Sequence, residues 1–289
     1  MLKIRYKNAL GETMDIGSSF PFLLGRNRGF AANDVTTLLG KGYNQNGSYY
    51  YGSQDEARIV SMTVYFSYLT EAEGKEKRKH IAKVFNPRLG MGQLTYEDDT
   101  GKYMIDAVVS VKPEIYKLDE NENTMTRSFD VVLTCPKPDW KNFESTQIKM
   151  VDFVGGLTFP ITFPIKFAER GDGGRIEYTG DNPAPCLLDF RVAQGGTSLS
   201  DPVVENHLGE YIKIKKTITQ GQRIIVDTNP DAPSIVFVDT DGTTQDAWNS
   251  LVFGSKFFQM QRGENVFSFW AASGDPELYL TYRERFAGV

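Results

Sequence analysis

Residues 58–68 read RIVSMTVYFSY, and this stretch decides the fold class. Apolar side chains occupy every second position of it, namely Val60, Met62, Val64, Phe66 and Tyr68. Alternation with a period of two places one set of side chains on each face of an extended chain. The pattern therefore predicts a long β-strand in a mainly β protein.

A helix is predicted directly after this strand. Thr70 and Glu73 form a capping box, in which the hydroxyl and the carboxylate satisfy backbone amides of a first helical turn. Asn86-Pro87 ends the helix, because a residue before proline avoids helical angles. Since few of the intervening residues are apolar, we expect a surface helix lying on a sheet.

Two hairpins are predicted after the helix. The runs 92–97 and 102–112 are separated by the turn sequence DDTG at 98–101. The runs 115–117 and 126–133 flank the charged sequence DENEN at 119–123, which we expect to project into solvent.

The sequence PKPDW at 136–140 is typical of a connector, because two prolines in three residues do not suit a central strand. We therefore predict two domains, residues 1–138 and residues 139–289. The second contains short β-rich runs punctuated by glycine turns, which favours a β-sandwich.

Composition excludes several function classes. The net charge of −5 and the pI of about 5.3 argue against a nucleic-acid partner, which requires clustered lysine and arginine. We also expect no membrane span and no secretory signal, because no apolar run of about eighteen residues occurs and the first residues are charged.

The side chains that usually carry chemistry are scarce. The only histidines are His80 and His207, and the only cysteines are Cys135 and Cys186, which lack C-x-x-C spacing. We expect the cysteines to be reduced. Aspartates crowd one region that could be imagined as a calcium site, but turn roles are favoured over that alternative: Asp227, Asp231, Asp239, Asp241 and Asp246. The sequence predicts no catalytic residue, no cofactor and no metal, and therefore no enzyme.

Two groups of aromatic residues are candidates for contact surfaces. Tyr49, Tyr50 and Tyr51 lie between Asn/Gly/Ser-rich flanks, which indicates a loop that either folds back on its own domain or contacts another subunit. Trp248 and Trp270 could stack on sugars, although large aromatic residues in β domains more often pack in the core.

The order of elements resembles the distal tail protein family of siphophages. The residues that carry the resemblance are the strand from Arg58, the helix with Arg78 and Ile81, the Asn86-Pro87 stop, the run 92–96 leading to Tyr103, and the C-terminal runs 209–212, 221–228, 263–269 and 282–286.

The resemblance implies a structural protein of the virion tail tip, made in the cytoplasm of the bacterial host. It implies a hexameric ring closed by an amino-terminal belt domain of sandwich, helix and hairpin, with a galectin-like β-sandwich as the carboxyl-terminal domain. The implied partners are the major tail tube protein on one side and a tail-associated hub protein on the other, with a receptor-binding protein or host glycans as further candidates.

A ring protein needs strands that can pair across subunits, so the hairpin strands 102–112 and 126–133 are candidates for the subunit interface through β-augmentation. Their candidate residues, besides the three tyrosines, are Tyr103, Ile105, Phe129 and Val131. Two other functions remain open: a carbohydrate-binding adhesin module for cell-wall glycans, and a cell-wall hydrolase that would use acidic loop residues.

Overall fold

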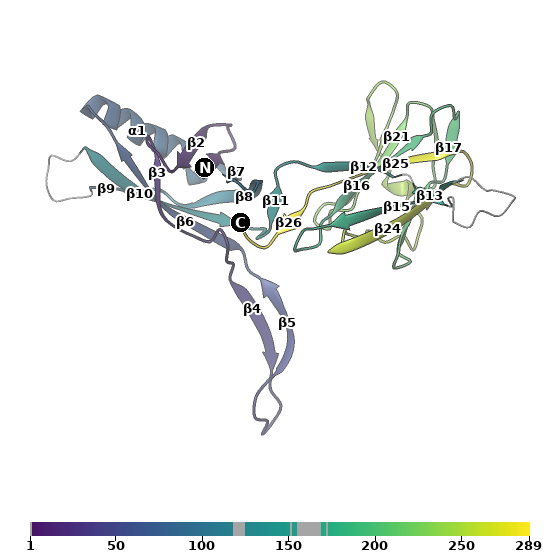
Figure 1. The fold of residues 1–289 in the computed structure, drawn as a ribbon, viewed down its shortest axis with the longest axis horizontal. Helices are drawn as coiled ribbons and strands as arrows, with labels where there is room; N and C mark the ends of the chain where they lie inside the picture. Colours follow the sequence, from purple (N-terminus) through teal and green to yellow (C-terminus); the bar gives the residue numbers. More distant parts are fainter. Residues whose placement is uncertain (1, 118–124, 151, 155–168, 172) are drawn as a thin grey trace, which may run out of the picture. The chain divides into compact units, whose positions relative to one another are not determined.

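The computed structural model describes residues 2–117, 125–150, 152–154, 169–171 and 173–289. The chain forms two compact units (Figure 1), which we describe separately. Unit 1 comprises Met1–Phe143 together with Phe286–Val289, and unit 2 comprises Glu144–Arg285. The chain thus passes between the units twice.

Unit 1 is a closed, mainly antiparallel sheet with one helix. Its elements are β1 (Lys3–Lys7), β2 (Thr13–Gly17), β3 (Leu23–Arg28), β4 (Val35–Gly40), β5 (Tyr49–Asp55), β6 (Arg58–Ser67), α1 (Glu71–Val84), the 3-10 turn η1 (Pro87–Leu89), β7 (Gly92–Glu97), β8 (Lys102–Val111), β9 (Ile115–Lys117), β10 (Thr126–Cys135) and β11 (Trp140–Asn142). The strands lie in the order β8-β7-β1-β2-β3-β6-β10, and β10 also pairs with β8. This last pairing closes the sheet, which wraps around the core. The β2–β3 pair alone is parallel within it, through Gly17 and Leu23.

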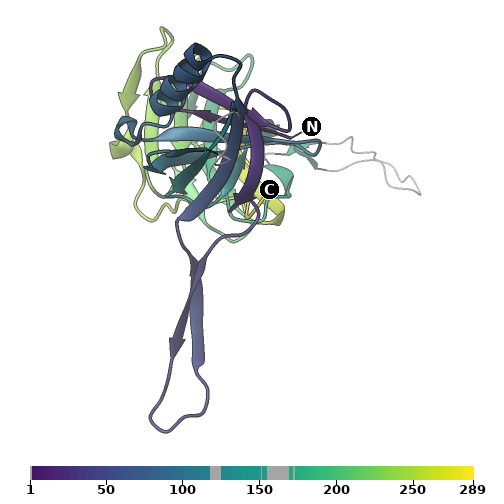
Figure 2. The ribbon, with the colours of Figure 1, turned by 90° about the vertical axis from the view of Figure 1, so that its left-hand side faces the viewer.

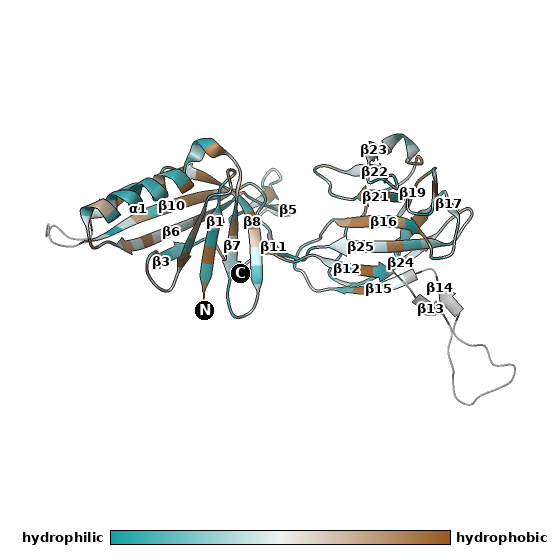
Figure 3. Ribbon diagram, turned by 90° about the horizontal axis from the view of Figure 1, so that it is seen from above, coloured by the Kyte–Doolittle hydropathy of each residue, from teal (hydrophilic) through white to brown (hydrophobic). Residues whose placement is uncertain are grey.

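The alternation in residues 58–68 sets the position of the core. Val60, Met62, Val64 and Phe66 of β6 are buried, and the residues between them are partly exposed. Arg58, the first residue of the strand, is also buried. Figure 3 shows the same banding of apolar and polar positions along the strands of unit 1, whereas α1 is largely hydrophilic. The predicted mainly β architecture is confirmed.

The helix begins and ends where the sequence predicts. Thr70 caps α1 by accepting a hydrogen bond from the amide of Glu73 at 3.2 Å, and a Glu73 carboxylate oxygen accepts one from the amide of Leu69 at 2.8 Å. Ile81 and Val84 are the apolar side chains that α1 buries. No helix in the described residues is long and apolar enough to cross a membrane.

Both predicted hairpins form. β7 and β8 pair in register from Gly92 opposite Ala107 to Glu97 opposite Lys102, and Asp98 accepts hydrogen bonds from the amides of Thr100 and Gly101 in the turn. β9 pairs with the start of β10. The tip that the sequence predicts to project, residues 119–123, lies outside the described residues.

Unit 2 is a sandwich of short strands. Its elements are β12 (Thr146–Met150), β13 (Asp152–Val154), β14 (Glu169–Gly171), β15 (Gly173–Tyr178), β16 (Cys186–Val192), β17 (Ser198–Ser200), β18 (Val203–Asn206), β19 (Tyr211–Lys213), β20 (Thr217–Thr219), β21 (Arg223–Asp227), β22 (Ser234–Val238), β23 (Thr244–Asp246), η2 (Trp248–Ser250), β24 (Gly263–Trp270) and β25 (Pro276–Tyr282), followed by β26 (Arg285–Phe286) where the chain returns to unit 1. One sheet has the order β12-β25-β16-β21-β22-β23 and another the order β15-β24-β18-β19. Leu188 and Phe190 of the first sheet share a core with Phe267 and Phe269 of the second, as in sandwiches generally.

The segment after the predicted connector packs in unit 1. Trp140 is fully buried there, stacked on Phe30 with ring centroids 5.8 Å apart. β11 adds to the β8 edge through Lys141 and Asn142. Because β11 pairs with β8, the first unit extends past the connector prolines to Phe143. It therefore includes residues 139–143, which the sequence analysis assigned to the second domain.

Candidate functional site

A two-stranded arm is the most exposed apolar feature of unit 1. We use this name for residues 35–55, which comprise β4, β5 and the residues between them. Within the described part of the chain the two strands pair only with each other, from Val35 opposite Asp55 to Gly40 opposite Tyr49. Figures 1 and 2 show the arm extending away from the closed sheet of unit 1 as a narrow ribbon.

The three tyrosines lie on a strand of this arm. The prediction that these tyrosines lie in a loop is therefore wrong, because β5 begins at Tyr49. Aromatic residues favour extended backbone, and this preference prevails over the turn-forming residues that precede them. The alternative in which the segment folds back on its own domain is also wrong, since Tyr49, Tyr50 and Tyr51 are 60–71% exposed.

The arm carries further large apolar side chains that nothing in the described chain covers. Their exposed fractions run from 43% for Leu38 to 98% for Tyr43, and the set also includes Val35 and Leu39. Single exposed apolar residues are normal on a protein surface, but a contiguous group of them marks an interaction site.

Apolar side chains lie on both faces of the ribbon. Leu39 is opposite Tyr50 in the strand register, and opposite residues of a β pair share a face. The Tyr51 ring covers Gly40, where a Cβ atom would come within 2.2 Å of the ring. Tyr51 therefore lies on the opposite face from Leu39, because Gly40 and Leu39 are neighbours in the strand.

The root of the arm is fixed by Arg58, which is 1% exposed. Its guanidinium donates hydrogen bonds to the carbonyl oxygens of Gly29 at 2.7 Å, of Phe30 at 3.1 Å and of Ala32 at 3.1 Å. It also donates to the carbonyl of Pro138 at 2.7 Å and to that of Ala287. Burial lowers the pKa of Arg58 from its ordinary value.

Close backbone packing further restricts this root. Gly29 has a φ of +90°, and a Cβ atom there would lie 2.0 Å from the carbonyl oxygen of Ile59. The Trp140 indole donates a hydrogen bond to the Phe30 carbonyl at 3.0 Å, and the Val289 amide donates to the same oxygen at 3.2 Å. A rigid root presents the arm in one direction, which lowers the entropic cost of docking it.

The other predicted interface residues lie elsewhere in unit 1. Ile105, Phe129 and Val131 are core residues at 0–1% exposure, because the alternation along β8 and β10 turns them inward. Tyr103 is partly buried, and its ring meets Phe286 edge to face at 5.3 Å. β10 pairs with β6 on one side and with β8 and β9 on the other, so little of its edge is open to another chain. The contact that we propose below rests on the arm instead.

The two tryptophans of unit 2 are half-buried. Trp248 is 40% exposed and stacks on Phe257, with centroids 5.6 Å apart and planes at 6°. Trp270 is 39% exposed at the end of β24, opposite Val203. Among the described residues no ring contact joins the two tryptophans, and a sugar contact at either stays a prediction.

Carboxylates of unit 2 fill local roles in turns. Asp239 accepts hydrogen bonds from the Gln222 side-chain amide and from the backbone amide of Thr240, and Asp241 accepts them from the backbone amide and the hydroxyl of Thr243. These bonds hold the pKa of each carboxyl below its usual range. The Asp246 carboxylate accepts a hydrogen bond from the amide of Trp248. The described ranges contain no cluster of three or more residues that could hold a metal ion.

Both cysteines are buried, Cys135 in unit 1 and Cys186 in unit 2, and neither forms a disulfide. Desolvation raises the pKa of each thiol to about 12, which leaves both groups protonated near neutral pH. A protonated, inaccessible thiol is a poor nucleophile.

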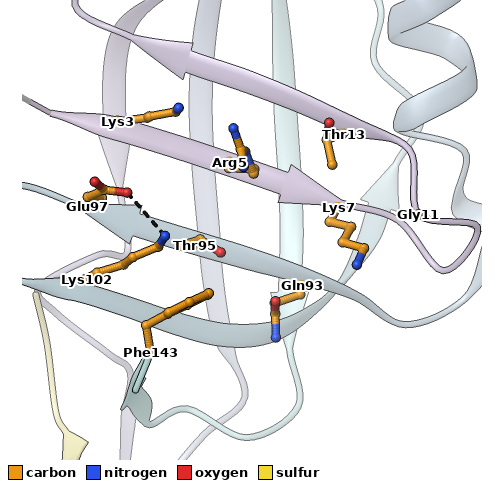
Figure 4. A pocket seen from close by; sticks show the side chains of 10 residues that line it. All are labelled: Lys3, Arg5, Lys7, Gly11, Thr13, Gln93, Thr95, Glu97, Lys102 and Phe143. Atoms are coloured by element: carbon orange, nitrogen blue, oxygen red, sulfur yellow. Dashed lines mark ion pairs between the residues drawn. The ribbon is translucent and has the colours of Figure 1, made fainter. Parts of the chain in front are cut away.

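A shallow hollow of about 330 Å³ lies on the outer face of unit 1. Figure 4 shows its lining, with Lys3, Arg5 and Lys7 projecting from β1 and Lys102 and Phe143 on the other side. The sequence interpretation did not single out this face. The signal was present as the alternation K-I-R-Y-K at residues 3–7, which places three cations on one side of a strand.

The chain matches two family models that follow one another along it. Residues 10–135 match the phage tail protein RIFT-related domain, and residues 179–286 match the C-terminal domain of the siphovirus-type tail component. None of the curated proteins is similar enough to this chain to count as a match.

Solved structures of similar fold come from phage tails. The SPP1 Dit protein, described as a paradigm of the hub adsorption apparatus in phages that infect Gram-positive hosts, is similar with a TM-score of 0.73 at 11% identity, over 99% of each chain. A chain of the phage P2 baseplate, in its activated conformation with calcium, has a TM-score of 0.54 at 10% identity, over 100% of each chain. The strontium form of that baseplate gives 0.51 at 10% identity, over 97% of this chain and 98% of the other.

The fold of both units and the two consecutive family matches confirm the resemblance drawn from the sequence: the chain belongs to the siphovirus distal tail protein family and is a structural component of the phage tail.

Proposed function

We propose that this chain is a non-enzymatic distal tail protein whose copies close into a hexameric ring, with the arm as the contact between neighbouring subunits. The ring joins the tail tube to the tail hub at the tail tip. The observation that carries the proposal is the arm itself, a ribbon with apolar side chains on both faces and a fixed root.

The arm has the physical properties of a subunit contact. A two-stranded hairpin is marginally stable alone in water, so a partner that covers it stabilises it. Its outer strand edges are unpaired in the described chain and can extend a neighbour's sheet. Covering one large apolar side chain stabilises a contact by roughly 1.5–3 kcal/mol, before the entropic cost of association.

A ring is the expected product of such a contact. The described residues of its own unit leave the arm uncovered, and in the proposed assembly it docks on a different part of a neighbouring copy. A contact between two different surfaces is head-to-tail, and head-to-tail contacts close into rings when the rotation permits. The tail tube protein and the tail-associated hub protein would then stack on the two sides of the ring.

The test is the mass of the assembled full-length chain, measured by native mass spectrometry with and without the tail tube and hub proteins. We expect a hexamer for the unaltered chain under at least one of these conditions. The triple variant Tyr49→Ser, Tyr50→Ser, Tyr51→Ser should remain monomeric under all of them, while keeping its circular dichroism spectrum.

Two controls separate the arm from a general effect of tyrosine loss. Tyr116→Ser removes an exposed tyrosine of β9 outside the arm and should leave the hexamer intact. Replacing the three arm tyrosines by phenylalanine keeps the rings and should retain assembly. A triple serine variant that assembles like the unaltered chain would overturn the role of the arm, and a monomer under every condition would overturn the ring.

A further inference from the structure

The outer face of β2, β1, β7 and β8 carries a strip of positive charge. Lys3, Arg5 and Lys7 alternate along β1 with the buried Ile4 and Tyr6, so the three cations lie on one side of the strand. The register places Thr95 of β7 beside Arg5 and Gln93 beside Lys7. Figure 4 shows these side chains around the hollow, with Lys102 on the β8 side.

The cations of this hollow exceed the carboxylates that pair with them. The Asp15 carboxylate forms ion pairs with the Lys3 ammonium at 3.3 Å and with the Arg5 guanidinium at 2.5 Å. Glu97 lies 3.5 Å from the Lys102 ammonium.

Lys7 forms no ion pair within the described residues. Four cations therefore face two carboxylates, which leaves two positive charges in excess on a protein of net charge −5. An uncompensated positive strip on an acidic protein attracts an anionic partner.

The remaining lining is suited to a polypeptide. Thr13, Gln93 and Thr95 offer hydroxyl and amide groups that can hydrogen-bond to a main chain, and Phe143 borders the hollow. The Lys102 ammonium lies 4.0 Å from the centroid of the Phe143 ring. This cation–π contact holds the lysine at the edge of the hollow. Few of the lining side chains are apolar, so an apolar ligand would gain little here.

We propose that this hollow binds an extended acidic segment of another protein chain, with carboxylates at alternate positions meeting Lys3, Arg5 and Lys7. Alternate residues of a β-strand are about 6.8 Å apart, and alternate residues of an extended peptide repeat at the same distance. The spacing of the three cations along β1 therefore matches the spacing of the carboxylates along such a segment.

The geometry favours a peptide over duplex nucleic acid. A duplex lays rows of phosphates over a wide surface and requires many lysines and arginines. Here the row formed by Lys3, Arg5 and Lys7 lies on one strand, and Asp15 and Glu97 flank it on the two neighbouring strands. A duplex laid over this face would bring its phosphates close to these carboxylates, which repel them.

The test uses the full-length chain and a fluorescein-labelled peptide of about ten residues in which glutamate and threonine alternate. Fluorescence anisotropy at low salt should detect binding that weakens as salt is added. Lys7→Glu should weaken the binding about fivefold to tenfold, because it replaces an attraction by a repulsion without breaking an ion pair within the protein. A peptide of alternating glutamine and threonine should not bind.

The matched control is Lys75→Glu, which makes the same charge change at an exposed position of α1 in the same unit. It should leave the affinity unchanged. An equal loss in both variants, or no binding of the acidic peptide to the unaltered chain, would overturn the proposal. A single-stranded oligonucleotide that binds more tightly than the peptide, and loses affinity with Lys7→Glu, would replace the peptide by nucleic acid.

Discussion

Arg58 illustrates how much one side chain can determine in this protein. Its guanidinium is buried and donates hydrogen bonds to five carbonyl oxygens from three separate segments, while the carboxylates of Asp139 and Asp55 also favour its charge. Those segments are the root of the arm, the connector at Pro138 and the returning C-terminus. Lysine has the charge but not the planar fork of donors, so it cannot replace these contacts.

We expect Arg58→Lys to lower the free energy of unfolding of unit 1 by about 3 kcal/mol, because buried carbonyls and a buried charge lose partners. Urea unfolding should be followed by Trp140 fluorescence, in a background where the other two tryptophans, Trp248 and Trp270, are phenylalanine. Arg88→Lys, at an exposed position of unit 1, is the control and should change stability little. If both variants unfolded at the same urea concentration, the bonds of Arg58 would contribute nothing measurable.

At the level of elements, the arm depends on a glycine. Gly40 has an ordinary φ, but the Tyr51 ring occupies the space of its missing side chain. A larger residue at position 40 displaces the ring without straining the backbone.

We therefore expect Gly40→Val to reduce subunit assembly at least as much as Tyr51→Ser, while the melting temperature of unit 1 stays the same. Native mass spectrometry measures the first quantity and calorimetry the second. Gly42→Ala is the comparison within the arm, since a Cβ there meets the Gln45 side chain and no ring. Normal assembly of Gly40→Val would show that the position of Tyr51 is unimportant.

For the whole molecule, the key feature is that the chain ends in the unit where it begins. Phe286 packs on Tyr103, Ala287 accepts a bond from Arg58, and the Val289 amide donates to Phe30. The last four residues thus support unit 1, although they follow the sequence of unit 2.

Removal of residues 286–289 should destabilise unit 1 by about 2 kcal/mol or more, through the loss of one aromatic contact and two hydrogen bonds. Unit 2 has its own core and should keep its stability. Hydrogen exchange checks both expectations: amides near residues 29–32 should exchange faster, and those of β16 and β25 should not change. Faster exchange throughout unit 2 would show that the tail supports both units.

Local chemistry was enough to predict several elements from the amino-acid sequence. The alternation in residues 58–68, the capping box at Thr70 and the DDTG turn each specify a strand, a helix start or a turn from neighbouring side chains alone. Resemblance supplied the family. The prediction that Tyr49–Tyr51 lie in a loop was wrong because propensity over a few residues does not show which strand pairs with which.

Which surfaces remain exposed became clear only from the folded chain. Ile105, Phe129 and Val131 looked as suitable for an interface as the tyrosines, yet closure of the sheet between β8 and β10 placed them inside. The arm residues Val35 and Leu39 gave the same apolar signal, and they are exposed because no strand of unit 1 pairs beside them. An apolar side chain in a strand is expected to be buried against other residues. Whether its own chain or another covers it depends on contacts between residues far apart in the sequence, which local patterns do not encode.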